Sequence, residues 1–183
     1  MDSRVATPTK GSTMFSRIIC IILASSLSAF AVDKAKVKAA AEKYLNQGKE
    51  LMAMINSGKI DAAKAEKISM EMADVAAGLL PEYISFDPKS EKLMKLVESE
   101  LPKIKKANFQ SLQDDFHDGG KLPASATGID LKKVANEKYT DPIHTIVHPL
   151  MTNDLLKSNN AKKAKEELSE GMDQMKELAE QLK

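Results

Sequence analysis

The chain has 183 residues and a formal net charge of +1 at pH 7, with no tryptophan and only 4% aromatic residues. Its only arginines, Arg4 and Arg17, lie near the start, so the remainder lacks the planar side chain that favours bidentate contacts with phosphate and guanine. We therefore expect no nucleic-acid binding. The scarcity of aromatic side chains also argues against a carbohydrate-binding cleft.

Residues 1–31 have the pattern of an export signal. Arg17 supplies a positive charge, an apolar run follows at 18–27, and Ala29-Phe30-Ala31 matches an A-x-A cleavage site. The apolar run is too short to remain in a bilayer as a stable membrane anchor. No cysteine follows the cleavage site to carry a lipid.

This signal defines the predicted mature protein. The sequence predicts a functional start at Met14, cleavage after Ala31 and a single helical bundle domain at 32–183 that is periplasmic or secreted. Cys20, the only cysteine, leaves with the signal. The mature domain is therefore expected to have no disulfide, thiolate nucleophile, iron–sulfur cluster or covalently attached haem.

The first two helices are predicted at 33–56 and 61–80, each opened by an aspartate at the N-cap. Gly58 suits the left-handed position that ends the first helix, and Pro81 stops the second. The link between them is so short that they must run antiparallel. Apolar residues at helical spacing predict the buried faces: Val37, Ala40, Tyr44, Gly48, Leu51, Met52 and Ile55, then Ala65, Ile68, Met72, Val75, Ala76 and Leu79.

A third helix is predicted from Asp87-Pro88, a cap followed by proline at the first helical position, to Phe116. Pro102 lies within it and should kink or divide it. The long loop at 118–141 begins near two consecutive glycines and is otherwise irregular, with a short helix after Asp130. A connection of this length in one domain is usually functional or disordered.

Asp141-Pro142 repeats the cap-and-proline signal and opens a fourth helix to Lys157, which Pro149 should disturb. After a turn at 158–160, a last helix keeps its apolar residues at a heptad spacing. No long segment alternates apolar and polar residues as a strand would. The sequence therefore predicts an all-α protein, an up-and-down helical bundle with four main helices plus a shorter one. Its last helix buries Ala161, Ala164, Leu168, Gly171, Met175, Leu178 and Leu182.

The three histidines all fall in one stretch of the chain. His117 ends the third helix and His144 lies near the start of the fourth, and in an up-and-down bundle these ends lie at the same pole. His148 follows His144 by four residues, one helical turn along the same face. We therefore expect the three imidazoles to converge at one end of the bundle.

Carboxylates and a thioether accompany these histidines. A D-x-x-H spacing, which points both side chains the same way on a helix, ends at His117 and again at His144, and His148 opens an H-x-x-M. Imidazole with carboxylate suits divalent zinc, and imidazole with thioether suits copper. The sequence predicts a Cu or Zn site, with noncovalent haem less favoured. Its predicted ligands are His117, His144, His148, Asp114, Asp118, Asp141 and Met151.

The same residues also have a purely structural interpretation. Asp141 is explained as an N-cap and the methionines as core filler. The chain has no G-x-S-x-G, phosphate loop, dinucleotide fingerprint or H-E-x-x-H, so no enzyme is identified. The sequence thus favours a periplasmic protein that binds a metal ion or small ligand. The alternatives are a structural or interaction module without ligand, with a protein partner or homodimer on its helix faces, and a haem-binding bundle.

Overall fold

The computed structural model describes residues 31–117, 120–121, 128 and 140–183, and within these residues the chain is helical and contains no strand. The predicted export signal and most of the connection at 118–141, including the helix expected after Asp130, lie outside the described residues. None of the described helices combines the length and the apolar character that a membrane span needs.

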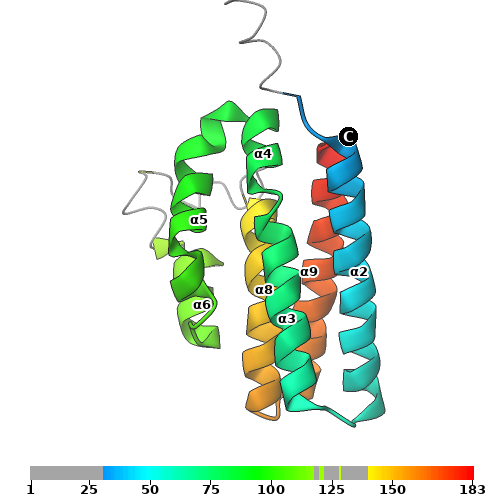
Figure 1. Ribbon diagram of the computed structural model, residues 1–183. Coiled ribbons are helices and arrows are strands. Elements are labelled where there is room, and N and C mark those ends of the chain that lie inside the picture. The colour runs from blue at the N-terminus through cyan, green and yellow to red at the C-terminus, as the bar shows by residue number, and fades with distance from the viewer. Residues whose placement is uncertain (1–30, 118–119, 122–127, 129–139) are drawn as a thin grey trace, which may run out of the picture. The chain divides into compact units, whose positions relative to one another are not determined.

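In the described part of the chain, four helices form a bundle: α2 (Lys34–Ser57), α3 (Ala62–Ala77), α8 (Thr140–Lys157) and α9 (Ala161–Gln181). They pack in the cyclic order α2, α3, α8, α9, and each runs antiparallel to its neighbours (Figure 1). Between α3 and α8 the chain forms α4 (Leu80–Phe86), a 3-10 turn (Pro88–Ser90), α5 (Glu91–Ile104) and α6 (Phe109–Phe116), of which α6 packs on α8. The predicted all-α, up-and-down helical bundle is confirmed.

The first two helices begin and end where their capping residues predict. Asp33 and Asp61 each accept a hydrogen bond of 3.0 Å from the backbone N–H three residues on. Gly58 ends α2 in the left-handed conformation, with φ of 67°. A helix cannot pair its terminal backbone groups internally. The two aspartates accept hydrogen bonds from N–H groups at the helix starts, and the Gly58 N–H donates to a carbonyl at the end of α2.

The middle of the chain differs from the prediction at Pro81 and agrees with it at Pro102. Helix α3 ends at Ala77, three residues earlier than predicted, and Pro81 lies in the first turn of α4 instead of stopping a helix. Proline fits that position because the first turn needs no N–H donor. Pro102 lies inside α5, which ends two residues later at Ile104. The predicted third helix is therefore divided, and its pieces stand beside the bundle as α5 and α6.

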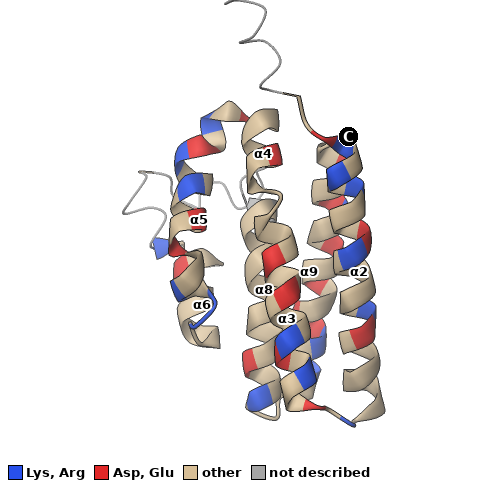
Figure 2. Cartoon of the chain, viewed as in Figure 1, with Lys and Arg blue, Asp and Glu red and all other residues tan. Residues whose placement is uncertain are grey.

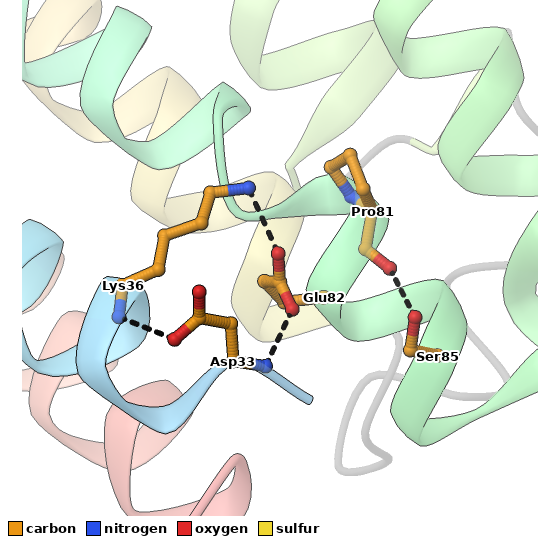
Figure 3. Close-up of polar contacts among 5 residues, drawn as sticks. All are labelled: Asp33, Lys36, Pro81, Glu82 and Ser85. Atoms are coloured by element: carbon orange, nitrogen blue, oxygen red, sulfur yellow. Dashed lines mark hydrogen bonds and ion pairs between the residues drawn. The ribbon is translucent and has the colours of Figure 1, made fainter. Parts of the chain in front are cut away.

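Glu82 joins the start of α2 to α4 (Figure 3). Its carboxylate accepts hydrogen bonds from Lys36 Nζ at 2.8 Å and from the Asp33 N–H at 2.9 Å. The bond from Lys36, and then that from Asp33, holds the pKa of Glu82 below its usual value. Within α4, Ser85 Oγ donates to the Pro81 carbonyl at 3.0 Å. The N-terminus of α2 is thus fixed by a side chain 49 residues away.

Charged side chains of both signs are interspersed along the outer faces of helices such as α2 and α5 (Figure 2). Several form ion pairs within one helix, for example Lys95 Nζ with Glu91 Oε1 at 2.6 Å. Both partners remain largely exposed, and such surface pairs contribute little to the free energy of unfolding. The stability of the fold therefore comes from its buried faces.

Helix α8 is enclosed on several sides, because α3, α9 and α6 all pack against it. Every residue from 142 to 153 is buried except the half-buried His144. Polar side chains in such a helix need partners. Thr145 and Thr152 find them in the carbonyls three and four residues earlier in the same helix, at 3.0 and 2.8 Å.

Pro149 does not interrupt α8, contrary to the expected disturbance. Proline has no N–H, so the carbonyl of Thr145, four residues earlier, loses its helical donor. The hydroxyl of Tyr44 on α2 donates to this carbonyl at 2.9 Å. The Tyr44 side chain is completely buried, and this burial raises its pKa well above the usual range, so the hydroxyl remains a donor. Helix α2 thus supplies the hydrogen bond that the proline removes.

Replacing Tyr44 with phenylalanine should lower the free energy of unfolding by about 1–3 kcal/mol, because it leaves the buried carbonyl without a donor while keeping the ring. Urea denaturation measures this change. In a Pro149→Ala background the N–H of residue 149 is restored, and Tyr44→Phe should then cost less. An equal loss in both backgrounds would contradict this role for the hydroxyl.

Candidate metal centre

The three histidines converge, as their spacing predicts. The ring centroids of His117 and His144 lie 4.5 Å apart and stack at an interplanar angle of 25°. The His148 ring stands edge-on to both, at 5.0 Å from His117 and 5.6 Å from His144. Side chains 31 residues apart in the sequence therefore form one cluster of imidazoles.

Helix α6 brings His117 to this cluster. His117 directly follows α6, and at the other end of the helix the Phe109 N–H donates to Asp154 Oδ2 on α8 at 2.9 Å. Because one end of α6 meets residue 154 and the other meets the histidines, α6 runs antiparallel to α8. Phe116 and Leu112 are buried and anchor α6 in the core.

Helix α9 approaches the cluster at Gly171. A Cβ atom at this position would lie 2.7 Å from His148 Cβ and 3.0 Å from Tyr44 Oη, so only glycine allows this approach. Both His148 and Gly171 lie near the middle of their helices. The cluster is therefore located partway along α8 and α9 rather than at the end of the bundle, where the sequence placed it.

Glu167 on α9 orients His148. Its Oε2 lies 3.0 Å from His148 Nδ1, and both side chains are buried. A neutral histidine that donates from Nδ1 keeps its lone pair on Nε2. Histidines that bind metals commonly have such a carboxylate partner, which fixes the tautomer and the ring orientation.

Two overlapping groups of side chains offer ligand atoms within 4.8 Å of one another. One consists of the three imidazoles of His117, His144 and His148. The other contains His117, His148, Glu167 and Glu170. Imidazole nitrogen and carboxylate oxygen are ligands of zinc and of other divalent first-row metals.

His144 is kept neutral by its surroundings. Burial first, and then the neighbouring imidazoles of His117 and His148, lower the pKa of His144 from 6.5 to about 3. Its Nδ1 atom is buried and has no hydrogen-bond partner among the described residues. A buried polar atom without a partner is uncommon in folded proteins, and coordination to a metal would satisfy it.

Of the other predicted ligands, Asp114 belongs to neither of these groups in the described part of the chain. Asp114 is instead paired with Lys121, whose Nζ lies 3.5 Å from Asp114 Oδ2. Met151 is completely buried in the hydrophobic core. Asp118 lies outside the described residues, and so does the side chain of Asp141. Asp114 is thus accounted for by its ion pair at the surface, and Met151 stays a predicted ligand.

Glu167 and Glu170 were missed by the sequence interpretation. Glu167 comes three residues after Ala164 and four before Gly171, both of which were predicted to face inward. A glutamate on the inner face of an amphipathic helix is unusual, because burying an unpaired carboxylate is costly. This position could have marked Glu167 as the partner of a histidine, and Glu170 follows it by one helical turn.

The fold and the site define an all-α bundle with a partly buried group of histidines and glutamates able to hold a metal ion. Comparisons with protein-family models, with curated proteins and with solved structures found no match for this chain. The functional interpretation therefore depends on the geometry and chemistry of the site.

Proposed function

We propose that this chain is an exported, periplasmic protein that binds a divalent transition metal, Zn or Cu, through His117, His144 and His148. The convergence of the three imidazoles, with ring centroids 4.5–5.6 Å apart, carries the proposal. The neutral His144 and the orientation of His148 by Glu167 support it, because a metal ligand must be deprotonated and its lone pair directed at the metal.

Metal binding requires a small rearrangement of the rings. Nitrogen ligands around tetrahedral zinc lie about 3.3 Å apart, given Zn–N bonds of about 2.0–2.1 Å. The stacked rings of His117 and His144 cannot both direct a nitrogen at one point, so at least one turns about its Cβ–Cγ bond when the metal binds. Glu170, which is exposed, or a water molecule completes the coordination.

Calorimetric titration with Zn²⁺ and with Cu²⁺ tests the proposal directly. We expect one metal ion per chain, and each single histidine-to-alanine variant should weaken binding at least about tenfold because it removes a ligand. The triple variant should lose the site while keeping its helical circular dichroism spectrum. Equal, weak binding by the wild type and the triple variant would contradict the proposal and favour an interaction module without a metal.

Glu167→Gln should weaken zinc binding about tenfold, because the amide orients the His148 ring but no longer raises its basicity. Glu166→Gln is the matched control, since Glu166 is the exposed neighbour on the same helix. The measurement is zinc affinity by competition with a chelator. The same loss of affinity in both variants would show that the overall negative charge, and not the contact with His148, is responsible.

A further inference from the structure

The two groups of candidate ligands share His117 and His148 but differ in their other members. In one group, here called the three-histidine set, the third ligand is the imidazole of His144. In the other, here called the mixed set, Glu167 and Glu170 of α9 supply carboxylate oxygens. The same two histidines therefore belong to a set of nitrogen ligands and to a set of nitrogen and oxygen ligands. These two sets suit different metal ions.

The mixed set has the chemistry that an oxygen-preferring divalent ion requires. Carboxylate and water oxygens suit Mn²⁺, whereas imidazole nitrogens suit zinc and copper. The two carboxylates of the mixed set together balance the charge of a divalent ion, and a charge that is removed from water needs such partners. The three-histidine set supplies no negative charge, so it offers a hard ion neither the preferred ligand atoms nor charge balance.

The mixed set also has nearly the dimensions of an octahedral site. For bonds of about 2.2 Å, between those of Mg²⁺ and Ca²⁺, adjacent ligands lie about 3.1 Å apart and opposite ligands about 4.4 Å apart. Glu167 Oε2 and His148 Nδ1 are 3.0 Å apart, and the ligand atoms of the set all lie within 4.8 Å of one another. An ion bound to both of these atoms would replace the hydrogen that they share, and His148 would carry its proton on Nε2.

Glu170 opens the mixed set to water. It is exposed, whereas His148 and Glu167 are buried and His117 is half-buried. The three-histidine set has no exposed member. An octahedral ion needs more ligands than the mixed set offers, and water can fill the remaining positions beside Glu170. Zinc is commonly four-coordinate and has less need of them.

We propose that the mixed set of His117, His148, Glu167 and Glu170 binds a divalent ion that prefers oxygen ligands, of the class of Mn²⁺. The inference rests on the proposed metal-binding function, because it gives His117 and His148 the same role as ligands. Since the two sets share these histidines, Mn²⁺ and zinc exclude each other. Glu170 and His144 distinguish the two ions: Glu170 holds Mn²⁺ and His144 holds zinc.

Parallel titrations with Mn²⁺ and Zn²⁺ test the proposal, and the electron paramagnetic resonance spectrum of free Mn²⁺ measures how much of that ion is bound. Glu170→Gln should weaken Mn²⁺ binding at least about tenfold and zinc binding less than about threefold, because water can replace Glu170 on zinc. His144→Ala should have the opposite pattern. Glu166→Gln, which removes the same charge from an exposed neighbour outside both sets, should change neither affinity. Circular dichroism verifies that the three variants are folded.

Competition completes the experiment, since an equimolar addition of zinc should release bound Mn²⁺. Absence of Mn²⁺ binding up to about 1 mM in a chain that binds zinc would overturn this proposal and leave the zinc site standing. Simultaneous binding of both ions, or equal losses of Mn²⁺ affinity in Glu170→Gln and Glu166→Gln, would also overturn it. Mn²⁺ binding that depends on Glu170 in a chain without zinc affinity would support the mixed set and reject the three-histidine site. Absence of binding of either ion would overturn both.

Discussion

Replacing Gly171 with alanine should lower the free energy of unfolding by about 1–3 kcal/mol and weaken metal binding at the histidine cluster. The new Cβ would lie 2.7 Å from His148 Cβ, which is attached directly to the backbone of α8. Neither atom can move by a rotamer change, so α8 and α9 must separate. This separation would disrupt the packing and also the contact between His148 and Glu167.

Gly48→Ala is the matched control for this prediction. The Cβ at position 48 would meet Met172 Sδ at 2.6 Å, but a methionine side chain can change rotamer and give way. Both glycines lie inside helices, so alanine gains about 1 kcal/mol of helix propensity at either site. We expect Gly48→Ala to be near neutral in urea denaturation and in zinc titration. Similar losses in both variants would show that helix separation at Gly171 is not the cause.

The helix ends of this fold could be predicted where they depend on residues that are close in the sequence. The caps at Asp33 and Asp61 and the left-handed Gly58 set the ends of α2 and the start of α3. Pro81 and Pro149 were misjudged, because proline is tolerated wherever its missing N–H is not needed or is replaced. At Pro149 the replacement comes from Tyr44, 101 residues before the carbonyl that it serves. A contact of that separation has no signature in the local sequence.

The candidate metal site was likewise predictable only in the features that depend on the local sequence. Chain direction and the spacing of four residues between His144 and His148 were enough to predict that the imidazoles converge. The contribution of α9 was not predicted, because it depends on how closely that helix can approach α8. Gly171 permits this approach, and Glu167 reaches His148 as a result. The sequence therefore predicts acidic partners next to the histidines, whereas the structure supplies them from the following helix.

The metal-free protein should lose stability as the pH falls below about 6.5. The pKa of His144 is about 3 in the folded chain, against 6.5 for an ordinary histidine. Between these values the unfolded chain binds a proton at His144 that the folded chain does not, so acid favours unfolding. The stability that this histidine contributes is fully present above pH 6.5. The expected loss between about pH 8 and about pH 5 is roughly 2 kcal/mol.

Urea denaturation across this pH range, with a chelator present, measures the effect. His144→Gln removes the titrating group and should flatten the dependence on pH. Glu82 also has a lowered pKa in the folded chain. The stability that it contributes is lost only as the pH falls below 4.5, the ordinary pKa of a glutamate. Glu82 therefore does not affect the measured stability above about pH 5. Added zinc should enlarge the loss on acidification, because the metal stabilises only the folded chain with deprotonated histidines. An unchanged pH dependence in His144→Gln would mean that this imidazole is not held neutral by burial among its neighbours.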